Sequence, residues 1–124
     1  KEVEKSKIAV LGLTFKAGTD DLRSSPSLAV IEYLLDLNAH VSAYDPMVNL
    51  PIEDMSKIEI TSTAYEAANN ADALVILTEW EEFADLNYER IHEAMCHPVV
   101  VDARNLLNPQ DLEQQGFQYI GLGQ

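Results

Sequence analysis

The chain has 124 residues, and its 21 acidic residues outnumber its 8 basic ones to give a net charge of −13. This excess argues against nonspecific binding to nucleic acid or to an anionic membrane surface, because both carry the same sign of charge. No apolar run reaches the roughly 20 residues of a membrane-spanning helix. We therefore expect a single globular domain over residues 1–124, in which residues 1–6 are the tail of a linker helix from an upstream segment.

The first predicted strand is Ile8–Gly12, a short apolar run that ends in glycine. A polar loop follows over Leu13–Ser25. Ser25 has the side chain of a helix N-cap, and Pro26 suits the first position of a helix. Apolar residues then recur at helical spacing as far as Asn38, a residue type that ends helices in the left-handed conformation. The chain is thus predicted to begin as a strand, a long loop and an amphipathic helix.

The rest of the chain alternates between apolar runs and amphipathic stretches. Further strands are predicted at Ala39–Tyr44, Ile58–Thr61, Ala73–Leu77, Val99–Asp102 and, at a sheet edge, Phe117–Ile120. Helices are predicted at Ala64–Asn70 with Thr63 as its cap, at Tyr88–Met95, and at Pro109–Gln115, where Gly116 ends the last one. Strands that alternate with helices form a parallel sheet covered on both faces. We therefore expect a three-layer α/β/α, Rossmann-like domain with a mainly parallel sheet of five to six strands.

Three of the few cations follow predicted strands. Lys16 and Arg23 lie in the loop after the first strand, and Arg104 follows the strand at Val99–Asp102. In open α/β sheets, ligands bind outside the carboxyl ends of the strands. Scarce cations at that edge of an acidic chain indicate an anion site, most simply for a phosphate. The helix that begins after Ser25 adds the positive end of its dipole.

The glycines of this loop do not form a standard phosphate-binding motif. Five residues separate Gly12 from Gly18, so the spacing fits neither the G-x-G-x-x-G turn of a dinucleotide site nor a P-loop. The loop also has structural interpretations that remain open. Lys16 could be only solvated, Arg23 could pair with the neighbouring aspartates at positions 20 and 21, and Phe15 could belong to the core. Those two aspartates lack a third ligand at suitable spacing for a metal ion.

A resemblance now adds to these observations. Gly12–Leu28 closely resembles the signature that opens the C-terminal, UDP-binding domain of the UDP-glucose/GDP-mannose dehydrogenase family. The resemblance continues, in matching order, through Ala43–Pro46, Ala71–Ala73, Leu77–Trp80 and Val101–Arg104. It covers nearly the whole chain. The long first block is specific, whereas the later short motifs would be weak alone.

The resemblance implies a role in a larger enzyme. Members of the family oxidise the primary alcohol of a nucleotide-sugar to a carboxylate in two steps, with two NAD⁺ as cofactor. An N-terminal Rossmann domain binds NAD, a central helical domain makes the dimer, and the C-terminal domain closes over the nucleotide-sugar. The chain is similar only to the last of these. We therefore expect a fragment of a cytoplasmic, homo-oligomeric dehydrogenase whose substrate is UDP-glucose, with GDP-mannose or a UDP-N-acetylhexosamine as alternatives.

The resemblance also implies roles for four residues. Phe15 and Lys16 match positions that contact the nucleotide part of the substrate. Arg104 matches a second substrate-binding position. Arg23 matches a position that reaches NAD bound on the N-terminal domain. Three of these four are the cations that the charge pattern had already selected.

Cys96 is the only cysteine, so a disulfide framework is excluded and a reducing compartment is expected. The nucleophilic cysteine of the family belongs to a part that this sequence does not contain. Cys96 is predicted near a helix C-terminus, where the dipole disfavours a thiolate. His97 is adjacent only in sequence, and His40 and His92 form no cluster with Cys96 that would indicate zinc. We therefore expect no catalytic residue and no metal site in this chain.

Two further positions and one further function stay open. Trp80 and Phe83 could line a ligand cleft or anchor the following helix. Asp45 could bind a ribose hydroxyl or form a turn with Pro46. The alternative to part of an enzyme is a regulatory module that binds nucleotides without catalysis. A phospho-acceptor signalling domain is excluded, because it needs acidic residues directly after the first strand.

Overall fold

The computed structural model describes residues 6–13, 26–36, 39–46 and 58–121. Its strands are β1 (Lys7–Leu11), β2 (His40–Tyr44), β3 (Ile58–Ile60), β4 (Ala73–Ile76), β5 (Val99–Asp102) and β6 (Gln118–Gly121). Its helices are α1 (Pro26–Asp36), α2 (Ala64–Ala68), α3 (Glu81–Ala84), α4 (Tyr88–Ala94) and α5 (Pro109–Gln114). The alternation of strands and helices that the sequence predicts is confirmed.

The strands form one six-stranded sheet in the order β3-β2-β1-β4-β5-β6. Every neighbouring pair is parallel, so the sheet is entirely rather than mainly parallel. β6 lies at an edge, as predicted. From β1 the chain adds β2 and β3 on one side, and it then adds β4, β5 and β6 on the other side, so the order of the strands reverses between β1 and β4. In sheets of this kind the crevice outside the strand ends at such a reversal is where ligands bind.

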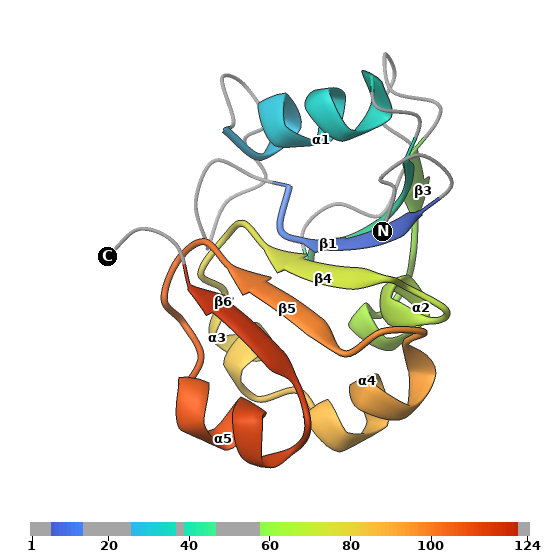
Figure 1. The fold of residues 1–124 in the computed structure, drawn as a ribbon. Helices are drawn as coiled ribbons and strands as arrows, with labels where there is room; N and C mark the ends of the chain where they lie inside the picture. The colour runs from blue at the N-terminus through green and yellow to red at the C-terminus, as the bar shows by residue number, and fades with distance from the viewer. Residues whose placement is uncertain (1–5, 14–25, 37–38, 47–57, 122–124) are drawn as a thin grey trace.

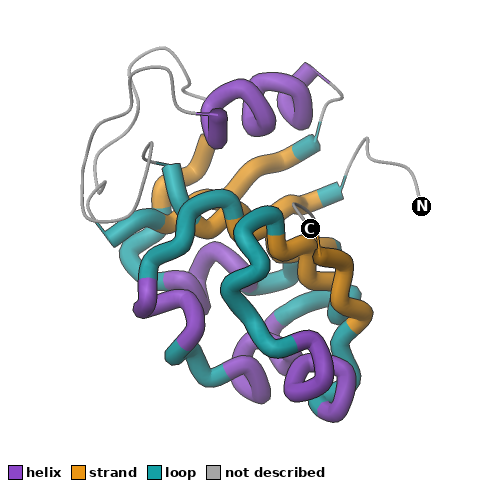
Figure 2. Tube along the Cα trace, turned by 90° about the vertical axis from the view of Figure 1, so that its left-hand side faces the viewer, coloured by secondary structure: helices purple, strands orange, loops and turns teal. Residues whose placement is uncertain are grey.

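Helices cover both faces of the sheet. α1 lies on one face and the remaining helices lie on the other (Figure 1). The view turned by 90° shows the strands between these two layers (Figure 2). β1 therefore buries side chains in both directions: Val10 packs with Ile31 of α1, whereas Leu11 belongs to the larger core on the opposite face. This two-sided burial explains why the strand is a continuous apolar run.

Helix ends follow the local signals that the sequence carries. α1 begins at Pro26, as predicted, whereas Ser25 and Asn38 lie outside the described residues. At the start of α2, the Thr63 hydroxyl oxygen accepts a hydrogen bond from the Glu66 N–H at 3.0 Å. Gly116, just past α5, has a φ of +94°, the left-handed conformation that commonly ends a helix. These capping residues are confirmed.

The sequence did not predict α3, a single turn over Glu81–Ala84. Its N-cap residue is Trp80, which makes no side-chain hydrogen bond to the helix start. The turn is held instead by Phe83, which is fully buried in the larger core. The predicted strand Val99–Asp102 matches β5, and the other predicted elements differ from the observed ones by at most two residues at an end, where helices and strands fray.

Candidate functional site

The carboxyl ends of the neighbouring central strands are aligned with one another. Backbone hydrogen bonds join the residue after each strand to the last residue of its neighbour: Gly12 N–H to the Tyr44 carbonyl at 2.9 Å, Leu77 N–H to that of Leu11 at 2.9 Å, and Ala103 N–H to that of Ile76 at 3.0 Å. The carboxyl ends of β1, β2, β4 and β5 thus form a continuous edge, which we call the carboxyl edge. It is the place where the sequence predicts an anion site.

Asp45, directly after β2, anchors the loop that leaves β1. Its side chain is buried, and its Oδ2 accepts a hydrogen bond from the Leu13 N–H at 2.8 Å. The sequence suggested a turn with Pro46 or a contact to a ribose hydroxyl. The structure shows Asp45 turned inward as a backbone acceptor. A buried carboxylate with such a partner fixes the chain just before residues 14–25.

Gly12 brings the end of β1 close to the residues that follow β4. Its φ of +104° lies in the left-handed region, and a Cβ there would lie 2.5 Å from the Thr78 Cβ. Thr78 itself is fully buried. Only glycine can occupy such a position without strain. Gly12, directly after β1, and Thr78, within the Leu77–Trp80 motif, are therefore packed directly together.

Asp102, the last residue of β5, organises the segment that carries Arg104. It is fully buried. Its Oδ1 accepts the Arg104 N–H at 3.1 Å, and its Oδ2 accepts the Leu107 N–H at 2.8 Å and the Tyr119 hydroxyl at 3.0 Å. Burial, together with the hydrogen bond to Asp102, raises the pKa of Tyr119 to about 12. Asp102 thereby fixes the turn after β5.

The Arg104 side chain pairs with Glu79, which follows β4. The Arg104 Nε lies 3.0 Å from Glu79 Oε2, and its Nη2 lies 3.4 Å from Oε1. The two side chains are 37% and 46% exposed. Exposed pairs of this kind stabilise a fold by at most about 1 kcal/mol. The structure thus places Arg104 at the carboxyl edge, where its predicted role in binding substrate stays a prediction.

The other three predicted site residues, Phe15, Lys16 and Arg23, lie outside the described residues. Their convergence with Arg104 on one anion therefore stays a prediction. The structure fixes what borders their loop on both sides: Leu13, held by Asp45, and Pro26, the first residue of α1.

Trp80 and Phe83 pack inward, which favours the anchoring interpretation over a cleft lining. Phe83 meets the Tyr44 ring edge-on, with ring centroids 6.2 Å apart. Tyr88 donates its hydroxyl to the Phe83 carbonyl, and Trp80 packs against the same core. The indole Nε1 of Trp80 is buried and has no hydrogen-bond partner among the residues that the structure describes.

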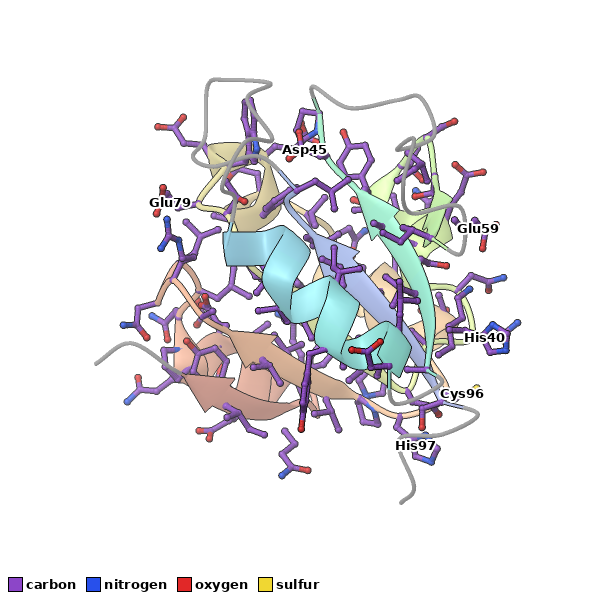
Figure 3. All side chains as sticks on the ribbon, turned by 90° about the horizontal axis from the view of Figure 1, so that it is seen from above. His40, Asp45, Glu59, Glu79, Cys96 and His97 are labelled. Atoms are coloured by element: carbon purple, nitrogen blue, oxygen red, sulfur yellow. The ribbon has the colours of Figure 1, made fainter. Side chains whose placement is uncertain are left out.

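The opposite end of the sheet has a different set of polar residues. Cys96 lies just beyond the C-terminal end of α4, as predicted, and is exposed. The neighbouring His97 pairs through its Nδ1 with Asp72 Oδ1 at 2.8 Å. Asp72 Oδ2 also accepts the Lys7 N–H at 2.9 Å. Figure 3 shows Cys96 and His97 at the end of the molecule away from Asp45 and Glu79. Cys96 is therefore remote from the carboxyl edge.

A pocket of about 440 Å³ lies beside β3, α2 and α4. Its cations have partners already: Lys7 Nζ donates to the Asn69 carbonyl at 2.5 Å, and the Arg90 guanidinium lies 4.0 Å from the centre of the Tyr65 ring. Glu66 also lines it. The pocket shares no residue with the Arg104–Glu79 pair. The pocket is lined by both acidic and basic side chains, and its two cations already have partners, so it is a poor match for a nucleotide phosphate.

Two further properties hold across the described residues. Those residues contain no group of three or more His, Cys, Asp or Glu side chains arranged to hold a metal ion. None of their helices has the length and apolar character that a membrane crossing requires.

Comparisons with known proteins match this geometry. Residues 9–109 match the model of the UDP-glucose/GDP-mannose dehydrogenase family, UDP binding domain. The UDP-glucose 6-dehydrogenase of Rhizobium meliloti (strain 1021) is 44% identical over 126 residues, an alignment that covers 98% of this chain and 28% of that protein. The chain thus spans less than a third of the length of the curated relatives that it matches.

Two solved structures share the fold over almost the whole chain. The NDP-N-acetyl-D-galactosaminuronic acid dehydrogenase of Methanosarcina mazei Go1 is 33% identical with a TM-score of 0.86, covering 100% of this chain and 26% of that one. The UDP-D-ManNAc dehydrogenase of Pyrococcus horikoshii is 31% identical with a TM-score of 0.80, covering 98% and 26%. The match over residues 9–109, on a parallel sheet with its loops anchored at one edge, shows that the chain belongs to the UDP-glucose/GDP-mannose dehydrogenase family and forms its UDP binding domain.

Proposed function

We propose that this domain binds the nucleotide of UDP-glucose in an NAD-dependent UDP-glucose 6-dehydrogenase, which oxidises the sugar to UDP-glucuronate in two hydride transfers. The observation that carries the proposal is the carboxyl edge, where buried Asp45 holds the Leu13 N–H and buried Asp102 holds the N–H of the predicted cation Arg104. The name of the Rhizobium meliloti relative supports the choice of UDP-glucose.

Arg104 and Lys16 are proposed to bind the pyrophosphate, and Phe15 is proposed to contact the nucleotide beside them. The chemistry suits these residues, because a pyrophosphate carries dense negative charge and the chain as a whole has a net charge of −13. A local cluster of cations is then required to overcome the repulsion. Arginine adds planar, paired donors that match phosphate oxygens.

The redox chemistry is proposed to belong to other parts of the parent protein. NAD would be held mainly by an N-terminal domain, and Arg23 would reach it from this one. We assign no bond-making step to this chain, and Cys96 lies at the wrong end of the sheet for one. On its own, the domain is expected to bind UDP at best with millimolar affinity, which corresponds to about −4 kcal/mol.

Other substrates of the same class remain candidates. The two solved relatives are named for N-acetylated sugars, and the family description includes GDP-mannose. All of these nucleotide-sugars carry a diphosphate and differ in the sugar or the base, so the cations of the carboxyl edge would serve all of them. A nucleotide-binding module without catalysis is the alternative of a different class.

The proposal is tested by calorimetry of UDP-glucose binding to the full-length protein. Arg104→Ala should weaken binding about ten-fold, or about 1.4 kcal/mol, because it removes charge-assisted bonds to phosphate. Arg90→Ala is the matched control, since Arg90 is an exposed arginine that stacks on Tyr65. Equal effects from the two substitutions would reject the carboxyl edge as the nucleotide site.

A further inference from the structure

We infer that Glu79 is a positioning residue that orients the Arg104 guanidinium toward an anionic ligand at the carboxyl edge. This inference rests on the proposed function, because it takes Arg104 as the group that contacts the diphosphate. It gives a role to a glutamate beside a site for an anionic ligand, where charge repulsion alone would disfavour an acidic residue.

The geometry of the pair leaves Arg104 able to bind a second anion. Glu79 occupies one edge of the guanidinium, with contacts to Nε at 3.0 Å and to Nη2 at 3.4 Å. A guanidinium has five N–H donors in a fixed plane, of which this contact uses two. The remaining donors, on Nη1 and on the far side of Nη2, form the edge that pairs with phosphate oxygens. Glu79 and a phosphate can therefore hold the same arginine from different sides.

Both members of the pair stand on rigid backbone. The Arg104 N–H is bound to the buried carboxylate of Asp102 at 3.1 Å. Glu79 follows Thr78, which is fully buried against Gly12. Glu79 and Arg104 follow the neighbouring strands β4 and β5, and Ile76 lies directly opposite Asp102 in the parallel register. The backbone positions from which the two side chains extend are thus set by these contacts.

Arg104 needs such a partner because it is well exposed. An arginine that is free to sample many rotamers loses that freedom when a ligand binds, and this loss weakens binding. An ion pair with Glu79 restricts the rotamers before the ligand arrives. The neighbouring negative charge has the opposite effect, because it repels an anion. Glutamine separates these two effects, since it keeps an acceptor oxygen for the guanidinium and removes the charge.

The test measures UDP binding by calorimetry on the full-length protein carrying Glu79→Ala, Glu79→Gln, Arg104→Ala or both alanine substitutions. Glu113→Ala serves as the control, because it removes the same charge from an exposed position on α5. Glu79→Ala should weaken UDP binding about five-fold through lost preorganisation. Glu79→Gln should bind UDP as tightly as the wild type or more tightly, and Glu113→Ala should have no effect.

The double variant distinguishes positioning from a general structural effect. If Glu79 acts through Arg104, then Glu79→Ala causes no further loss once Arg104 is alanine. An equal loss in both backgrounds, or tighter binding by Glu79→Ala than by the wild type, would overturn the positioning role alone. If Arg104→Ala binds UDP as tightly as the wild type, the proposed nucleotide site fails, and the role of Glu79 fails with it.

Discussion

The two ends of the parallel sheet both place aspartates beside backbone amides, but in different surroundings. At the carboxyl edge, Asp45 and Asp102 are buried and accept N–H bonds from residues of the loops that follow β1 and β5. At the amino end, Asp72 is partly exposed, and besides the Lys7 N–H it pairs with the surface imidazole of His97. Figure 3 shows the labelled residues of the two ends on opposite sides of the molecule.

The difference shows what each end is suited to do. At the amino end, the polar groups satisfy one another, as the Lys7 ammonium does with the Asn69 carbonyl. At the carboxyl edge, Asp45 and Asp102 turn inward and hold backbone N–H groups beneath the surface, and the exposed Glu79 is paired with Arg104. Arg104 then stands outside them, with part of its guanidinium available to a ligand. An acidic chain can present positive charge in this way only if its carboxylates are directed inward or paired.

The largest effect is expected from Gly12→Ala, at the close contact beneath the carboxyl edge. The new Cβ would strain a φ of +104° and would lie 2.7 Å from the Thr78 backbone nitrogen. We expect the free energy of unfolding to fall by about 4 kcal/mol, measured by urea denaturation. Gly116→Ala should reduce it by only about 1 kcal/mol, because the nearest atom there is the movable end of the His92 side chain, at 3.0 Å. Similar losses would mean that the Gly12 contact is not rigid.

Asp102→Ala compares the two ends directly. It removes the acceptor of two backbone N–H groups and of the Tyr119 hydroxyl, all at a fully buried carboxylate. We expect a loss of about 3 kcal/mol in the free energy of unfolding. Asp72→Ala should lower it by about 1 kcal/mol, since its carboxylate is partly exposed and water can replace it. The reverse order of these losses would contradict the contrast between the two ends.

Lys16→Ala tests the cation that the sequence places in the loop after β1. It should weaken UDP-glucose binding to the full-length protein about thirty-fold, or about 2 kcal/mol, as expected for a charge-assisted bond to phosphate. Lys57→Ala removes the same charge from a position just before β3 and should leave the dissociation constant unchanged. Calorimetry measures both. Matching losses would place the nucleotide elsewhere.

The smallest effect is expected from Tyr119→Phe. Loss of the hydrogen bond to Asp102 should reduce the free energy of unfolding by about 1 kcal/mol at neutral pH. The effect also depends on pH, because burial and Asp102 raise the pKa of Tyr119 from 10.0 to about 12 in the folded protein. A raised pKa gives stability that is complete below pH 10 and is lost as the pH rises from about 10 to about 12.

Urea denaturation across this alkaline range measures the second part of that prediction. The wild type should lose stability between pH 10 and pH 12 more steeply than Tyr119→Phe, so the two curves should converge. Parallel curves would mean that Tyr119 titrates alike in the folded and unfolded chains.

Much of the fold follows from local patterns in the sequence. Apolar runs that end in a turn residue predict the strands. Helix ends are marked by the Thr63 hydroxyl and by the backbone conformations of Pro26 and Gly116. α3 was missed because it has one turn and no side-chain cap, so only the burial of Phe83 defines it. Tertiary packing decides such short helices.

The site was less predictable, because its contacts join distant residues. The alternation of strands and helices predicts that Arg104 follows a strand at the carboxyl edge, and the structure confirms this placement. The partners of the buried aspartates are not visible in the sequence: Asp45 binds Leu13 across 32 positions, and Tyr119 binds Asp102 across 17. The pairing of Arg104 with Glu79 spans 25 positions. The sequence signal for these loop anchors is an aspartate at the carboxyl end of each of two apolar strands, Asp45 after β2 and Asp102 in β5.

A crystal structure of the full-length protein with UDP bound would test the nucleotide site most directly. We predict the diphosphate at the carboxyl edge, within ion-pair distance of Arg104 and Lys16, with Glu79 still on the opposite side of the Arg104 guanidinium. A diphosphate bound in the pocket beside β3, or at the amino end near His97, would contradict it.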